Sequence, residues 1–472
     1  MAITVTAAGL YALLSLVRFY GYRASNYDLV IHDQAVRGYA AFTGPICPLL
    51  GFDRGLGLGF SQLGDHFAPI LAILAPLYWL HDGPETLLVA QAVLFALAIP
   101  PIWSYTRRML GTGPAYLVAT AYAISWPVAQ AVNFDFHEVA FVPVLTAVMI
   151  ERFHAKKHVA AALAAAALLL VKEDMGLVVA GFGCFALIRG RRLNGAAYIA
   201  LGLSYTLLVR EVLTPAFGGD PMYHWHYDGL GKNIAEVLGT FASDPLSVLN
   251  RFVTPQVKVE TLAFLLWPAL LTCLFSPLML MALPHFLERM LSDIPNWWAS
   301  DFQYNAFTVV IILCAGVDGT ARLAQWMGRR VGTRTWALTW AAGVFVAALT
   351  LVPRFPFYQL IEPQFYERGP DVIAADEAIK VVPDGVVVEA ANNIGPRLSG
   401  RTTVLNWGDL PPVADWIVAD VARISFPWHS TDEEKQRADE LVAMGYEVVF
   451  YRDGYVVLHR TSPSGQPAKV VP

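Results

Sequence analysis

The sequence has little charge for its length. Aspartate, glutamate, lysine and arginine make up 15% of the 472 residues, whereas hydrophobic residues make up 56%. A soluble globular domain carries roughly 25% charged residues, because charge keeps its surface hydrated. The composition therefore excludes an ordinary soluble protein and indicates one that is surrounded by a lipid bilayer.

Two further shortages narrow the class of protein. The chain has four cysteines, which gives no basis for a disulfide framework. The 33 lysines and arginines are scattered in small groups, and the formal net charge at pH 7 is -5. Such a distribution forms no basic stripe, so nucleic acid is not expected as a partner.

Long apolar blocks without acids or bases take the place of charge. A helix that crosses a bilayer needs about 20 apolar residues, and several blocks approach this length. They predict an α-helical polytopic membrane protein with about eleven transmembrane helices. The blocks occupy residues 3–20, 87–105, 115–132, 139–153, 158–171, 175–189, 195–213, 262–275, 277–290, 304–320 and 336–352.

The basic residues between these blocks predict how the chain is oriented. Lysine and arginine concentrate in cytoplasmic loops of membrane proteins, and here they fall in alternate loops. We therefore expect a multi-pass protein of the plasma (inner) membrane with its N-terminus in the cytoplasm and its C-terminus outside. The basic residues of these loops are Arg107, Arg108, Arg152, Lys156, Lys157, Arg189, Arg191, Arg192, Arg322, Arg329, Arg330 and Arg334.

The composition changes abruptly after the last apolar block. Residues 1–352 are predicted to form the transmembrane domain, residues 353–462 a small extracytoplasmic α/β domain, and residues 463–472 a disordered tail. Within the α/β domain, strand-like runs alternate with helix-like runs. The strand-like runs are 386–389, 402–406, 416–419, 448–451 and 456–459, and the helix-like runs are 371–381 and 431–444.

Two long loops are expected on the outer side of the membrane. The first, residues 21–86, contains an apolar segment at 66–80 that we interpret as a re-entrant or juxtamembrane helix. The second, residues 214–260, has a helical pattern at 234–252 that predicts an amphipathic helix on the membrane surface.

This topology gathers the acids and histidines on one face. Ionisable groups close to hydrocarbon are costly unless they are paired, hydrated or bound to a metal, so their clustering predicts a functional site. Carboxylates are ligands for Mg²⁺, Mn²⁺ or Ca²⁺, and a divalent metal is one hypothesis for the cluster. The candidates are Asp28, Asp33, Asp65, His66, Asp135, His137, Glu138, Lys172, Glu173 and Asp174.

Each of these residues also has a structural interpretation. Asp28 can be a solvated residue at the end of a helix, and Glu173 can pair with Lys172. Aromatic and imidazole side chains of the outer loops, among them His224, Trp225 and Tyr304, can stack on a sugar or form the interfacial belt of a membrane protein. The convergence of four loops favours a binding site over these alternatives.

Several motifs carry a resemblance that covers most of the chain. They resemble a family of bacterial predicted membrane proteins, which is in turn similar to the C-type (GT-C) glycosyltransferases. Members of that superfamily are membrane enzymes that take a sugar from a polyprenyl-phosphate donor. The motifs are Tyr27-Asp28-Leu29 with Asp33-Gln34, residues 64–69, Phe134 to Glu138, Lys172-Glu173-Asp174 and the region from Pro284 to Tyr304.

The resemblance implies an activity and a role for the first outer loop. The chain is expected to transfer a sugar from a polyprenyl-phosphate-linked donor to an envelope glycan or protein acceptor. An acid just after the first helix would act as base or metal ligand, which maps to Asp28 or Asp33. The commonest superfamily pattern has two adjacent acids here, but Leu29 follows Asp28, so the choice between the two stays open.

Two hypotheses from other classes remain at this point. A transporter or flippase for a lipid-linked or polar solute would use the acids as a proton or ion relay. A non-catalytic membrane scaffold that presents its α/β domain is the third alternative, and it leaves the acid cluster unexplained.

Overall fold

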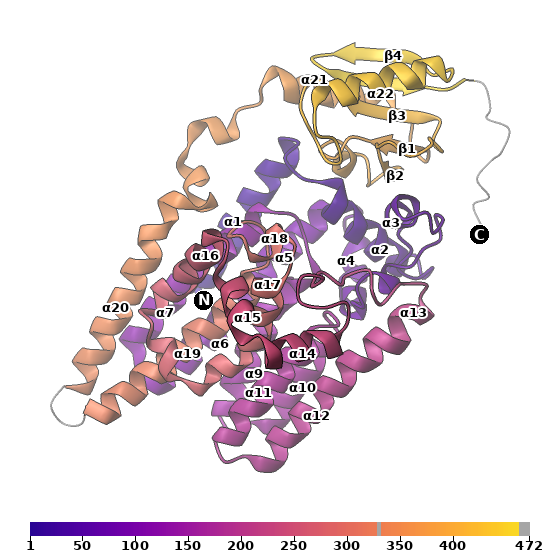
Figure 1. Ribbon diagram of the computed structural model, residues 1–472. Coiled ribbons are helices and arrows are strands. Elements are labelled where there is room, and N and C mark those ends of the chain that lie inside the picture. The colour runs from indigo at the N-terminus through magenta and orange to yellow at the C-terminus, as the bar shows by residue number, and fades with distance from the viewer. Residues whose placement is uncertain (328–331, 462–472) are drawn as a thin grey trace.

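The computed structural model describes residues 1–327 and 332–461. A large helical part is followed by a small domain with a five-stranded sheet, which lies at one end of the helical bundle (Figure 1). The tail predicted to be disordered, 463–472, lies outside the described residues.

The helical part is that of a polytopic membrane protein. Among the described residues, 6 helical spans are long and apolar enough to cross a membrane. They are α1 (Ala2–Tyr20), α5 (Glu85–Leu97) with α6 (Ile99–Leu110), α7 (Thr112–Ala123) with α8 (Trp126–Asn133), α12 (Arg192–Leu208) with α13 (Thr214–Ala216), α19 (Ala306–Met327) and α20 (Thr333–Leu351).

Three shorter apolar helices lie between these spans. They are α9 (Phe141–His154), α10 (His158–Leu169) and α11 (Met175–Ile188). The predicted division of 158–189 is confirmed, because α10 ends before Lys172 and α11 begins after Asp174. The charged tripeptide therefore forms a connection at one end of the bundle.

Two predicted spans, 262–275 and 277–290, are not continuous helices. Helix α16 (Gln256–Leu266) ends before Pro268, and Leu270 and Leu271 then adopt positive φ angles of 51° and 58°. Short 3₁₀ turns lead to α17 (Leu283–Leu291) and α18 (Pro295–Trp298). Proline and left-handed residues interrupt the helical hydrogen bonds, which apolar composition alone does not reveal.

The two long loops that are expected on the outer side contain short helices. The first loop holds α2 (Ile31–Ala40), α3 (Pro48–Asp53), and a 3₁₀ turn at Pro69–Leu74 that leads into α4 (Ala75–Tyr78). The second holds α14 (Ile234–Ser243) and α15 (Pro245–Val253) in place of the one helix predicted at 234–252. The break occurs because Asp244 caps α15 by accepting a hydrogen bond from the Ser247 N–H, with Pro245 in the first turn.

The C-terminal domain has the strands and helices that the sequence predicts, to within one residue at nearly every end. Its mixed sheet has the order β2-β1-β3-β5-β4, with β1 parallel to β2 and β3, and β5 antiparallel to β3 and β4. The elements are α21 (Pro370–Val381), β1 (Val387–Ala390), β2 (Thr403–Asn406), β3 (Trp416–Asp420), α22 (Thr431–Ala443), β4 (Glu447–Arg452) and β5 (Tyr455–His459).

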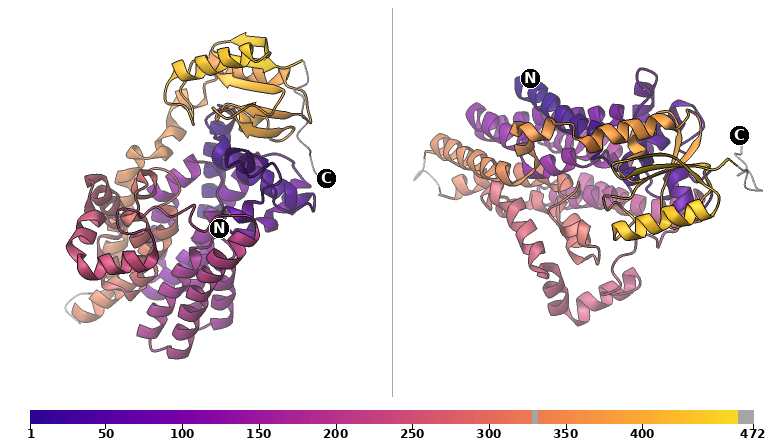
Figure 2. Two further views of the ribbon diagram at one scale, coloured as in Figure 1. Left: turned by 45° about the vertical axis from the view of Figure 1, so that its right-hand side comes forward. Right: turned by 90° about the horizontal axis from the view of Figure 1, so that it is seen from above.

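The sheet domain and the first outer loop share one hydrophobic core. Val30, Ile31 and Phe60 of the loop pack into the same apolar cluster as the buried residues of the sheet. The Asn26 side chain donates a hydrogen bond of 2.8 Å to the Ala390 carbonyl. The sheet domain therefore fixes the loop that carries Asp28, and Figure 2 shows it lying against that segment.

The orientation of the bundle can be tested with reporter fusions. The basic loops at α6–α7, α9–α10 and α11–α12 are expected in the cytoplasm. A reporter that is active only outside the cytoplasm should therefore work when fused after Val352 and fail when fused after Arg192. Activity at both positions, or the reverse pattern, would contradict the predicted topology.

Candidate functional site

A cavity of about 580 Å³ lies where the first outer loop meets the helical bundle and the sheet domain. Its walls come from segments that are hundreds of residues apart in the sequence. The structure thus brings together most of the acids and histidines that the sequence predicted for one site. The predicted residues that line this cavity are Asp28, Asp65, His66, His137, Glu138, Lys172, His224 and Tyr304.

Asp28 lies in a π-helical turn, Asn26–Val30, that directly precedes α2. Such turns are rare and often occur at functional sites. His32 lies one turn after Asp28, and its Nδ1 is 2.8 Å from the Asp28 carbonyl oxygen. The Asp28 side chain keeps 26% of its surface exposed and faces the cavity.

Two histidine–carboxylate pairs surround Asp28. The His137 Nε2 lies 3.0 Å from the Asp28 carboxylate, and the His32 Nε2 lies 2.9 Å from Glu138. Burial lowers the pKa of His137, but the charges of Asp28 and Glu138 outweigh it and raise the pKa above its ordinary value. The raised pKa favours the protonated form of His137 beside Asp28.

Two basic side chains, His66 and Lys172, also line the cavity. Burial and Lys172 lower the pKa of His66, but Glu173 and Asp65 outweigh them and raise it to about 9. Burial also lowers the pKa of Lys172, but Asp174 and Glu173 more than offset this and raise it. Both side chains are therefore protonated at neutral pH and form a place where an anion would be stabilised.

An apolar groove of about 690 Å³ adjoins these two side chains. Its walls are formed mainly by α11, α12, α14 and the segment around α17, and most of its surface is apolar. Asp65, His66, Lys172, His224 and Trp297 line both the cavity and the groove. The two spaces thus meet at a polar edge.

Three other predicted residues line the groove. They are Glu173, Asp174 and Trp225. Glu173 is half-buried and accepts a 2.8 Å hydrogen bond from His66 Nδ1. Burial alone would raise its pKa, but the positive charge of His66 outweighs this and lowers the pKa to about 2. Burial and the charge of Glu288 raise the pKa of Asp174 to about 6.

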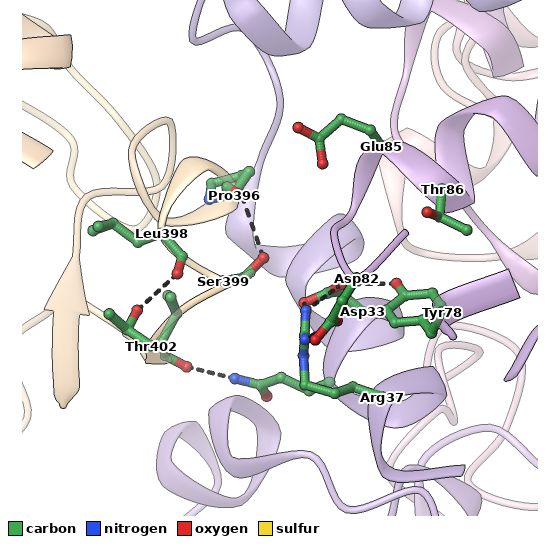
Figure 3. Close-up of polar contacts among 12 residues, drawn as sticks. Asp33, Arg37, Tyr78, Asp82, Glu85, Thr86, Pro396, Leu398, Ser399 and Thr402 are labelled. Atoms are coloured by element: carbon green, nitrogen blue, oxygen red, sulfur yellow. Dashed lines mark hydrogen bonds and ion pairs between the residues drawn. The ribbon is translucent and has the colours of Figure 1, made fainter. Parts of the chain in front are cut away.

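Asp33 lies outside the cavity, although its sequence position resembles that of Asp28. Its fully buried carboxylate lies 3.1 Å from the Arg37 guanidinium and accepts a 2.7 Å hydrogen bond from Tyr78. Figure 3 shows this cluster against Ser399 of the sheet domain. These contacts tie α2 to α4, and of the two acids only Asp28 lines the cavity.

Asp135 also lies outside the cavity and the groove. Its Oδ2 accepts hydrogen bonds from the Ser25 N–H at 2.8 Å and from the Ser25 hydroxyl at 2.5 Å. Asp135 therefore holds the backbone just before Asp28.

The cavity also contains residues that the sequence did not single out. Arg54 donates to Asp65, and Asn392 and Phe426 bring the sheet domain into the wall. His32 follows Asp28 by four residues, a helical spacing that could have signalled its contact. Asn392 and Phe426 carry no comparable signal, because their placement depends on how the two domains pack.

The residues near Asp28 fit a divalent metal poorly. His137, whose raised pKa favours its protonated form, already faces the Asp28 carboxylate, and the next acid, Glu138, is paired with His32. Two other groups of acids and histidines have ligand atoms within 4.8 Å of one another. They are Asp65, His66 and His224, and Asp174, His285 and Glu288.

Comparison with solved structures identifies the class of fold. ArnT from Cupriavidus metallidurans, bound to undecaprenyl phosphate, is similar over 96% of this chain and 97% of its own, with 14% identity and a TM-score of 0.52. The archaeal oligosaccharyltransferase AglB from Archaeoglobus fulgidus, with an inhibitory peptide and a dolichol-phosphate, matches over 97% of this chain and 74% of its own, with 13% identity and a TM-score of 0.45. The likeness to ArnT shows that the helical bundle and its small α/β domain have a GT-C-like fold.

The family follows from the sequence itself. The chain belongs to the family described as predicted membrane protein (DUF2079), which matches residues 18–457. A comparison with curated proteins finds no match.

Proposed function

We propose that this protein is a membrane glycosyltransferase that moves a sugar from a polyprenyl-phosphate donor to an extracytoplasmic acceptor. The observation that carries the proposal is the junction of two spaces at one basic edge. A cavity with an accessible Asp28 lies on one side of His66 and Lys172, and an apolar groove lies on the other. A polyprenyl-phosphate sugar needs both spaces, because its sugar is polar and its lipid tail is apolar.

The groove suits the apolar tail of the donor. Leu177, Leu203 and Leu287 line its walls, and burial of such surface stabilises a bound lipid by about 25 cal/mol per Å². The phosphate of the donor would then lie at the edge beside Lys172, with its sugar in the cavity. The similar ArnT structure holds undecaprenyl phosphate, which has this chemistry.

Asp28 would act as the general base. Its carboxylate accepts the proton of an acceptor hydroxyl while the hydroxyl oxygen attacks the anomeric carbon of the sugar. The bond between that carbon and the phosphate oxygen breaks, and the configuration inverts. The bonding electrons leave with the lipid phosphate, whose charge Lys172 and protonated His66 stabilise.

The acceptor would enter from the outer side, next to the sheet domain. Asn392 and Phe426 of this domain line the cavity together with Trp297 and Tyr304. Aromatic faces of this kind stack on sugar rings. An envelope glycan or an envelope protein fits this entrance, and we place the protein in the plasma membrane with its C-terminus outside.

Purified protein in liposomes tests the function directly. Polyprenyl-phosphate sugars with a labelled sugar are supplied together with acidic and neutral glycan or peptide acceptors, and we expect label to move to an acceptor. The same liposomes report whether the lipid crosses the bilayer. If no donor gives transfer, and the lipid crosses the bilayer in a way that depends on the acidic side chains of the site, the transferase is contradicted and a flippase is supported.

A further inference from the structure

Three side chains outside the Asp28 cavity converge at the polar end of the apolar groove. Asp174 lies in the connection before α11, and His285 and Glu288 lie one turn apart on α17. Each can offer one ligand atom, and these atoms lie within 4.8 Å of one another. Small adjustments would bring them to the roughly 2.0 to 2.2 Å bond lengths of a metal centre.

Two atoms of this group lack a partner. Within residues 1–327 and 332–461, the Nε2 of His285 and the Oδ1 of Asp174 are buried without a hydrogen bond. His285 is 1% exposed, and its other nitrogen lies 3.2 Å from Glu288. The imidazole and the Glu288 carboxylate are therefore neighbours that one metal ion could bind together.

The other candidate group fits a metal less well. Asp65 already accepts hydrogen bonds from Arg54 and from His224. The rings of His66 and His224 stack with their centroids 4.3 Å apart and only 16° between their planes. Imidazole lone pairs lie in the ring plane, so stacked rings do not direct them at a common centre.

We propose that Asp174, His285 and Glu288 bind one divalent cation of the Mn²⁺ or Zn²⁺ type. One imidazole nitrogen with two carboxylates suits these ions better than Mg²⁺ or Ca²⁺, which prefer oxygen ligands throughout. The cation would also relieve the repulsion between two neighbouring carboxylates. Binding of the metal doesn't depend on the proposed transferase activity.

The position of the site suggests its use. Asp174 and Glu288 line the groove, as Lys172 does. A cation there would add positive charge where the donor phosphate is expected to lie. This consequence rests on the proposed function. The cation would contact the phosphate of the donor lipid, so its effect would not depend on which sugar the lipid carries.

Titration of metal-free protein with Mn²⁺, followed by electron paramagnetic resonance, tests the site without any donor or acceptor. We expect one tightly bound Mn²⁺ that Zn²⁺ displaces. Glu288→Gln and Asp174→Asn should each weaken binding by more than about tenfold, because loss of even a residue that supports a ligand costs 10- to 100-fold. The same metal concentration should raise the melting temperature of the unsubstituted protein more than that of Glu288→Gln.

Asp65→Asn is the matched control, since it removes one carboxylate charge from the other candidate group. Its Mn²⁺ affinity should stay unchanged. Absence of a tight Mn²⁺ site in the unsubstituted protein would overturn the proposal. Equal affinity in folded Glu288→Gln, or loss of binding in Asp65→Asn alone, would overturn it as well.

Discussion

Replacement of Asp28 by asparagine should lower the rate of sugar transfer by about 10² to 10⁴-fold, the usual loss when a general base is removed. Asparagine keeps the shape of the side chain but cannot take up the acceptor proton. Because Asp28 lies in the cavity and outside the groove, the affinity for the lipid donor should change little. Single-turnover transfer and equilibrium binding of a fluorescent polyprenyl phosphate measure the two effects separately.

Asp33→Asn is the matched control for this experiment, with the same change five residues away. The Asp33 carboxylate is paired with Arg37 and Tyr78, so its loss should lower the melting temperature. Folded Asp33→Asn protein should still transfer sugar. If Asp28→Asn is fully active while Asp33→Asn loses the chemical step, the base has been assigned to the wrong residue.

The sequence predicts the local structure well where the pattern is strong. The short apolar runs at 386–389 and 416–419 become β1 and β3, and the charged tripeptide at Lys172 separates α10 from α11. These features depend on neighbours along the chain, which the sequence displays. The broken segment at 262–290 was missed because its composition is as apolar as that of a continuous helix, and its end is set by Pro268 and two left-handed residues.

Part of the candidate site could be predicted from the sequence, and part depends on long-range packing. Burial near lipid makes acids such as Asp28 and Glu138 conspicuous, so they stand out in the sequence. The choice between Asp28 and Asp33 depends on which side of α2 each carboxylate occupies. That orientation is fixed by the packing of the sheet domain on the loop, a contact between residues more than 350 positions apart, such as Asn26 and Ala390. No local pattern contains it.

Replacement of Lys172 by methionine should weaken binding of the lipid donor strongly. A charge-assisted hydrogen bond to a phosphate contributes about 1.5 to 3 kcal/mol, which corresponds to about ten- to 150-fold in the Kd. The loss should exceed this range at neutral pH. Lys172 acts on Glu138, Glu173 and Asp174 through charge, without a side-chain hydrogen bond to them among the described residues, and in its absence they would repel the phosphate.

The pH dependence of this variant distinguishes charge from packing. The pKa of Asp174 is already raised to about 6, and removal of the lysine charge would raise it further. In metal-free protein, protonation of this acid should therefore restore part of the donor affinity of Lys172→Met already as the pH falls towards about 6. Lys172→Arg keeps the charge and should bind the donor within about tenfold of the original protein, at the modest cost of a different geometry. If Lys172→Met binds the donor as well as the original protein at every pH, the phosphate does not lie at this edge of the cavity. The proposed path of the lipid would then be wrong as well.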